Sequence, residues 1–148
     1  MTHRVDQVLD AIVALMPSTA AAFKHRTLSL DPDEGELPAR SVRYGEEDPA
    51  DDDGSSNLAF IDVMLTVEID HKLQADDEDT AKAQLLEMCR ETHVALMADD
   101  SLGLNFVIGI GYAGASAPEI DAEKEYTVAV RTSRWRVYFR TSKTDPAA

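Results

Sequence analysis

Residues 58 to 71, which read LAFIDVMLTVEIDH, alternate between two kinds of side chain more regularly than any other part of the chain. One set is apolar and comprises Ala59, Ile61, Val63, Leu65, Val67 and Ile69. The other set is mixed and comprises Phe60, Asp62, Met64, Thr66, Glu68 and Asp70. A period of two is typical of a β-strand with one buried face. At about 3.3 Å per residue this strand would span roughly 45 Å, so we expect it to extend past the core that it covers.

A second long strand is predicted in residues 124 to 146, which read KEYTVAVRTSRWRVYFRTSKTDP. Its apolar residues fall first on even positions and then on odd ones: Tyr126, Val128 and Val130, followed by Trp135, Val137 and Phe139. Because a strand alternates strictly, this change of parity predicts a bend, a bulge or a turn between Arg131 and Arg134. The residues RTSR lack the Gly or Asn of a tight hairpin, which favours a bulge that aims the strand at a neighbouring subunit.

Two amphipathic helices are also predicted. The first has apolar residues at helical spacing, Thr2 as its N-cap and Pro17 after its end; its buried stripe is Val5, Leu9, Ile12, Val13 and Met16. The second begins at Asp76 or Asp77, where an acidic first turn suits the helix dipole. Its buried stripe is Leu85, Met88, Cys89, Thr92 and Leu96. A short helical turn is expected in residues 18–25.

The remaining segments complete an α+β domain, a mostly antiparallel sheet with long strands packed by two main helices. Residues 26–44 read as two short extended pieces, residues 104–114 as a strand, and residues 115–125 as a connecting loop. Nothing divides the chain, so we expect one domain over residues 1–148. Six acidic residues between Glu46 and Asp53 predict a mobile loop at about 45–57. A calcium loop counted from Asp51 would need glycine at its sixth position, but the glycine stands at the fourth.

The motifs of catalysis and cofactor binding give little signal. The single cysteine, Cys89, excludes an internal disulfide and reads as a small buried residue. The four histidines lack metal-ligand spacing. The segment GIGYAG, residues 109 to 114, lacks the spacing and the lysine of a phosphate loop. No apolar run approaches the length of a membrane span, and the amphipathic N-terminus lacks the apolar core of a signal peptide. We therefore expect no enzyme activity, no cofactor, no metal and no membrane partner.

Charge is the stronger clue, because the chain has a net charge of −14 and yet gathers arginines on its last strand. An acidic chain is poorly suited to general nucleic-acid binding. A solvated strand face would explain soluble arginines, but arginine and tyrosine are also enriched in interfaces. The alternative is a head-to-tail contact between identical subunits, which closes into a ring or propagates as a helix. Its candidate residues are Arg131, Arg134, Arg136, Tyr138 and Arg140 on one side, and Glu46, Glu47, Asp51, Asp52 and Asp53 on the other.

The C-terminal third also resembles a known family. Three short elements carry the resemblance: Asp100, Ser101, Leu102 and Gly103; Pro118 and Glu119; and Val137, Arg140, Thr141, Asp145 and Pro146, with Phe139 where a tyrosine usually stands. In this order they are similar to the tail terminator and tail completion proteins of long-tailed bacteriophages, the lambda minor tail protein U type. The N-terminal helix and the long central strand agree in order and kind. The acidic residues 46–53 and the repeated RTS depart from that pattern.

The resemblance implies a structural virion protein, assembled in the host cytoplasm, without catalysis. Such a protein forms a hexameric ring that caps the tail tube, stops its polymerisation and presents a surface to the head connector. Its partners would be copies of itself, the tail tube protein and the connector, while DNA passes through the ring without specific binding. An acidic lumen suits that passage. Two alternatives stay open: another neck protein, such as a head-closure or adaptor subunit, and a small enzyme or ligand-binding domain with a pocket near Gly109–Gly114.

Overall fold

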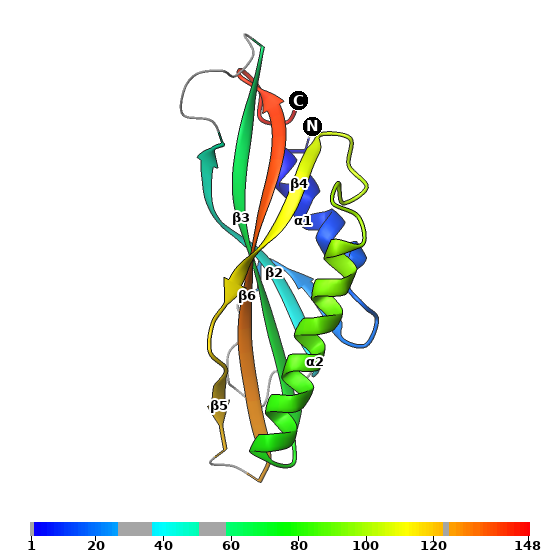
Figure 1. The fold of residues 1–148 in the computed structure, drawn as a ribbon, viewed down its shortest axis with the longest axis vertical. Coiled ribbons are helices and arrows are strands. Elements are labelled where there is room, and N and C mark those ends of the chain that lie inside the picture. Colours follow the sequence, from blue (N-terminus) through cyan, green and yellow to red (C-terminus); the bar gives the residue numbers. More distant parts are fainter. Residues whose placement is uncertain (1, 27–36, 51–58, 123–124) are drawn as a thin grey trace.

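The computed structural model describes residues 2–26, 37–50, 59–122 and 125–148. These residues form two helices and six strands in one mixed sheet (Figure 1). The elements are α1 Arg4–Leu15, β1 Ala21–Lys24, β2 Ala39–Pro49, β3 Phe60–Ala75, α2 Glu78–Met97, β4 Val107–Ala115, β5 Glu119–Asp121 and β6 Thr127–Ser142. The predicted α+β class with a mostly antiparallel sheet is confirmed.

The sheet is built around its two longest strands. The strand order is β1-β2-β3-β6-β4, and β5 pairs with β6 beside β4. All pairs are antiparallel except β1 with β2. β3 and β6 pair along their whole length, from Phe60 opposite Ser142 to Ala75 opposite Thr127. Figure 1 shows that these strands twist strongly and run almost the full height of the molecule.

The predicted bulge in β6 is wrong. Its register with β3 continues without a shift through Arg131–Arg134. The apolar residues change parity because the first part of β6 is buried on both faces: Thr127, Val128, Ala129 and Val130 are all buried. A strand buried on both faces reads as a continuous apolar run, so its pattern lacks alternation. The register shifts lie instead in β4, between Val107 and Gly109 and between Tyr112 and Gly114.

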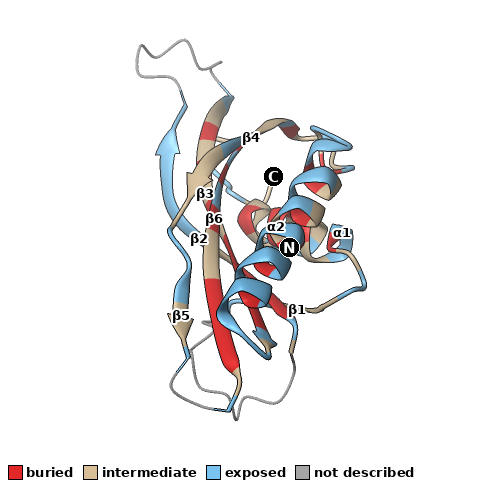
Figure 2. Cartoon of the chain, turned by 60° about the horizontal axis from the view of Figure 1, so that its bottom comes forward, coloured by how far each residue is buried: buried red, intermediate tan, exposed pale blue. Residues whose placement is uncertain are grey.

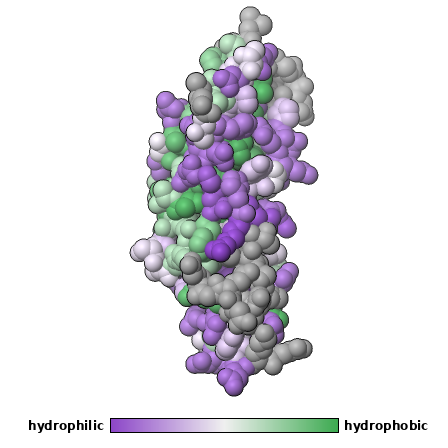
Figure 3. All heavy atoms as spheres, turned by 180° about the vertical axis from the view of Figure 1, so that it is seen from behind, coloured by the Kyte–Doolittle hydropathy of each residue, from purple (hydrophilic) through white to green (hydrophobic). Residues whose placement is uncertain are grey.

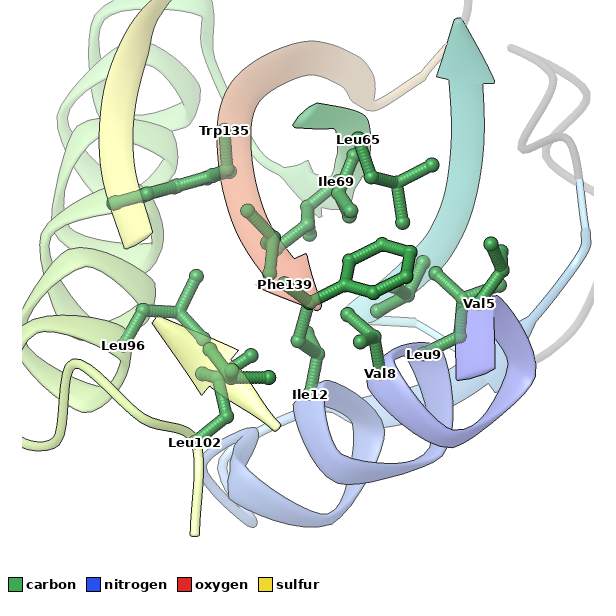
Figure 4. Close-up of a cluster of buried hydrophobic side chains, with 14 of the residues drawn as sticks. Val5, Val8, Leu9, Ile12, Leu65, Ile69, Leu96, Leu102, Trp135 and Phe139 are labelled. Carbon is green, nitrogen blue, oxygen red and sulfur yellow. The ribbon is translucent and has the colours of Figure 1, made fainter. Parts of the chain in front are cut away.

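The main core lies between one face of the sheet and the two helices. Figure 4 shows Phe139 of β6 between the side chains of α1 and those of β3, with Trp135 and Leu96 on the side of α2. To this core α1 contributes Val5, Val8, Leu9 and Ile12, and α2 contributes Leu96. A second, smaller cluster between α2 and the sheet consists of Leu73, Ala81, Leu85, Met88 and Ala129. In Figure 2 the buried residues follow this inner face, whereas the outer side of α2 and the far end of β2 are exposed.

Several local predictions for the first helix region need correction. His3, and not Thr2, is the N-cap of α1: its Nδ1 accepts a hydrogen bond from the backbone N–H of Val5 at 3.0 Å. Val8, which was not among the residues predicted to be buried, is fully buried, whereas Val13 is only partly buried. Residues 21–24, predicted as part of a helical turn, form β1. Parallel pairing of Ala21–Lys24 with β2 outweighs the helix propensity of an alanine run.

The other segments follow the prediction more closely. Asp77 caps α2, and its carboxylate accepts from the N–H of Thr80 at 2.7 Å. Residues 26–44 were expected as two extended pieces; residues 39–44 belong to the single strand β2, and residues 27–36 lie outside the described residues. The segment 115–125, predicted as a loop, contains the short strand β5.

Candidate subunit interface

The even-numbered residues of β6 face away from both helices, as their spacing predicts. Trp135, Val137 and Phe139 are buried in the core, so Arg134, Arg136, Tyr138 and Arg140 lie on the opposite face of the strand. We call this surface the open face, and it also includes Asp62, Met64, Thr66 and Glu68 of β3. Figure 3, the view from behind, shows hydrophilic residues along the middle of the molecule.

Arg131 does not belong to the open face. Its odd position places it on the helix side, where its Nε donates to the backbone oxygen of Ser116 at 3.0 Å. It also lines a cleft beside α2. The structure therefore separates Arg131 from the other four members of the predicted basic group.

Cross-strand ion pairs occupy much of the open face. Nε of Arg140 lies 2.8 Å from a carboxylate oxygen of Asp62, directly opposite on β3. Nε of Arg134 lies 3.7 Å from Glu68, also its direct partner. Donating a hydrogen bond to Asp62 raises the pKa of Arg140. The positive charges of β6 thus meet carboxylates of β3 within the same subunit, which the sequence could not reveal because the register was unknown.

Arg43 of β2 extends the row of charges. It contacts Glu68, and it donates from Nε and Nη2 to the two carboxylate oxygens of Asp70 at 3.0 and 3.2 Å. Hydrogen bonding to Asp70 raises the pKa of Arg43. Thr132 of β6 donates to the same carboxylate at 2.6 Å. These contacts join three neighbouring strands through one buried acid.

Arg136 differs from its neighbours, because it makes no ion pair with any residue that the structure describes. It lies between Thr66 of β3 and Gly111 of β4. Gly109 and Gly114 lie opposite Tyr138 and Arg134, so β4 presents glycines along this part of the open face. Gly114, at a register shift, has a φ of 107° that a residue with a Cβ rarely adopts. Since Gly111 has no side chain, no side chain of its row lies between Arg136 and this edge of the sheet.

Part of the acidic segment that was predicted to contact the arginines belongs to strand β2. Glu46 and Glu47 are exposed on the end of β2, so residues 45–49 are not the mobile loop that was predicted. A register shift lies between Tyr44 and Glu47. Asp51, Asp52 and Asp53 lie outside the described residues.

A cleft lies between α2 and β4; a pocket near Gly109–Gly114 was named from the sequence as an alternative, but the wall that α2 contributes was missed. Its volume is about 270 Å³, and its lining includes Leu86, His93, Val94, Tyr112 and Trp135. Leu86 and Val94 are more than half exposed, and Tyr112 is 49% exposed. The signal was a second apolar stripe on α2, Leu86, His93, Val94 and Met97, which the first stripe obscured. Exposed apolar groups gathered in one place mark an interaction site.

Cys89 lies in the wall of this cleft and is half-buried, contrary to its predicted place in the core. Burial raises the pKa of its thiol, although the charge of Arg131 acts in the opposite direction. A raised pKa keeps the thiol protonated and weakly nucleophilic at neutral pH. The ring of His93 packs edge-on against Tyr112 and Trp135, each at 5.2 Å between centroids. The cleft walls are therefore chiefly apolar and aromatic.

Comparison with known proteins gives no relative: no family model matches the chain, and no curated protein is similar enough to match it. Within the described residues, no group of three or more His, Cys, Asp or Glu side chains is arranged to hold a metal ion. Neither helix is long and apolar enough to span a membrane.

Proposed function

We propose that this protein is a structural ring subunit, a tail terminator that caps a phage tail tube, stops its growth and offers a surface to the head connector. The ring would be a homohexamer in the virion neck, and DNA would pass through it without specific binding. The observation that carries the proposal is the placement of exposed features on opposite edges of one sheet. One edge has an acidic strand end, and the other has an apolar cleft beside a glycine strand.

Unlike surfaces on opposite edges favour head-to-tail contacts, which close into a ring or propagate as a helix. The open face supports the same function, because its cross-strand ion pairs make a charged, hydrophilic surface along β3 and β6 (Figure 3). The segments of the family resemblance also have structural roles here. Ser101, Leu102 and Gly103 turn the chain after α2, and the carbonyl of Pro146 accepts from the N–H of Arg4 at 3.0 Å.

The test is assembly on tube ends. Purified protein is mixed with tail tubes, and electron microscopy scores whether density caps one tube end and whether tube growth stops. Light scattering at low and high salt measures the mass of the free protein, since salt screens exposed ion pairs. Capped tubes and a ring mass support the proposal; uncapped tubes that keep growing would overturn it.

A variant pair sharpens this test. Arg136→Glu reverses a charge that has no described partner, whereas Lys82→Glu makes the same change on α2, where Lys82 pairs with Glu78. We expect the first to weaken assembly and the second to leave it intact. Changing both Arg134 and Arg136 to glutamate should weaken assembly further, because it reverses a second positive charge on the open face.

Two other functions remain as competing proposals. A head-closure or adaptor subunit would use the same ring geometry but bind the connector and leave tube ends uncapped. A ligand-binding domain would use the cleft beside Tyr112 and Ala115. It would stay monomeric, and its melting temperature would rise with a small apolar ligand.

A further inference from the structure

Among the described residues, two strand edges are unpaired at the same level of the sheet. β1 covers β2 only from Ala39 to Val42, and among the described residues no strand pairs with the outer edge of β4. Tyr44 is connected to Tyr112 through the row Val67 and Trp135. The row through Val63 and Phe139 likewise connects Pro49 to Val107. The free segments Tyr44–Pro49 and Val107–Tyr112 therefore occupy the same rows on opposite edges.

The strand directions also match. β4 is antiparallel to β6, β6 to β3, and β3 to β2, so β2 and β4 run in opposite directions. A second copy shifted sideways without being turned over would bring its β2 antiparallel to β4 of the first. Antiparallel pairing of free edges is the arrangement by which one sheet continues into another.

On the helix side, this placement brings an aromatic side chain to the cleft. Tyr44 is 50% exposed and lies on the same face and in the same row as Tyr112. Tyr112 lines the cleft together with Leu86 and Val94 of α2. The Tyr44 ring of a neighbouring copy would cover these exposed apolar groups. Tyrosine is among the residues that most often dominate interface energy when they enter an apolar pocket.

On the open face, the same placement gives Arg136 an acidic partner. Two strand spacings separate β6 from the incoming β2, which is about 10 Å and within the combined reach of an arginine and a glutamate. Gly111 has no side chain in the way, and nothing lies within 4 Å of a Cβ built there. Glu46 lies in the irregular part of β2 at this level, and Asp48 lies two rows further along.

The irregular edges restrict which strand can pair. β4 has two register shifts, and β2 has one shift and a proline, features that discourage indiscriminate edge pairing. A long backbone ladder is therefore excluded, and the side chains on both faces must select the partner. A second copy of this chain supplies both the tyrosine and the acids in the matching rows.

We propose that the Tyr44–Pro49 end of β2 from one copy docks on β4 and α2 of the next, with Tyr44 in the cleft and Glu46 or Asp48 beside Arg136. This contact rests on the proposed ring function and specifies how its subunits join. It is heterologous, because the two copies use different surfaces, so repetition around an axis closes a ring.

Cysteine cross-linking tests the contact. In a Cys89→Ala background, Asp48→Cys and Gly109→Cys place thiols in one row on opposite edges, on the open face. Asp48 is exposed, and Gly109 has free space for a Cβ, so the fold should tolerate both. Mild oxidation of the double variant, alone and with tail tubes, should give a ladder of covalent oligomers. The control is Lys24→Cys with Gly109→Cys, because Lys24 lies on the same edge as Asp48 but several rows away.

The outcomes separate the docking mode from the ring function. A ladder from the first pair and none from the control supports the proposal. Equal ladders from both pairs, or oligomers by light scattering without any ladder, overturn this docking mode while self-assembly stands. Monomers with no ladder, both alone and with tubes, overturn the docking mode and the ring function together.

A charge exchange provides a second readout. Arg136→Glu should weaken self-association about tenfold or more. Adding Glu46→Arg and Asp48→Arg in the same chain should restore it, because each interface then again joins unlike charges. Failure of this restoration, with the folded state of every variant intact, would contradict the assigned pairing.

Discussion

The hydroxyl of Thr92 on α2 lies 2.8 Å from Nε2 of His71 on β3, and both side chains are completely buried. The same hydroxyl oxygen accepts from Nε of Arg40 at 2.9 Å, and Nδ1 of His71 lies 3.3 Å from the backbone oxygen of Arg131. A carbonyl can only accept, so Nδ1 carries the proton, and Nε2 accepts from Thr92, whose single hydroxyl proton also faces the backbone oxygen of Met88 at 3.2 Å. The network is therefore satisfied by a neutral imidazole.

Because of His71, we expect the free energy of unfolding to fall in mild acid. Burial, and then the charge of Arg40, lower the pKa of His71 from 6.5 to about 4. Between these two pH values His71 is protonated in the unfolded chain and neutral in the folded protein. The contribution is present above pH 6.5 and is lost as the pH falls toward 4, by up to about 3 kcal/mol. Urea unfolding of wild type and His71→Gln, near pH 7 and near pH 4.5, measures it.

The glutamine variant retains hydrogen-bonding groups but cannot titrate, so it should lose less stability between the two pH values than wild type. The other histidines and the carboxylates are present in both proteins, and their contributions cancel in the difference. Equal losses in the two proteins would show that His71 does not carry this dependence.

Asp70 predicts a stability effect at the junction of three strands. Its carboxylate is 3% exposed and accepts from both Arg43 and Thr132. Asp70→Ala removes these acceptors and should lower the free energy of unfolding by about 2 kcal/mol. Asp62→Ala is the matched control, because its pair with Arg140 lies at the surface and should matter much less. Chemical denaturation that ranks the two variants in the opposite order would contradict this account.

How far the sequence predicts this structure depends on how regular each segment is. The apolar set of β3 and the faces of Trp135 and Arg136 were predictable, because strict alternation needs no knowledge of partners. The first part of β6 was not, because burial on both faces removes the alternation that a parity argument requires. Only the register of β6 with β3 shows that β6 has no bulge there.

The candidate site was less predictable, since it depends on contacts distant in sequence. Asp62 and Arg140 are separated by 78 positions, and no local pattern specifies their pairing. The cleft was hidden because α2 is apolar on two sides, which weakens its amphipathic signal. Arg131 was grouped with the open face on charge alone, whereas its odd position places it beside α2.

Truncation of Phe139 should carry a large cost in stability. This residue is fully buried within the main core (Figure 4). It also packs edge-on against Phe106, with 6.2 Å between ring centroids. Phe139→Ala should therefore lower the free energy of unfolding by about 4 kcal/mol. Tyr138→Ala, one residue away on the open face, should cost far less. Urea denaturation compares the two, and similar costs would contradict the assignment of faces.

Gly111 separates folding from assembly. Its φ is outside the left-handed region and no atom lies within 4 Å of a built Cβ, so Gly111→Val should leave the thermal midpoint of the subunit nearly unchanged. The added side chain would stand between Arg136 and the incoming β2, and self-association should weaken about tenfold. Ala117→Val adds similar bulk at an exposed position outside the proposed contact and should leave association intact. Light scattering over a dilution series measures both variants. Unchanged association of Gly111→Val would show that no partner side chain crosses this glycine to reach Arg136.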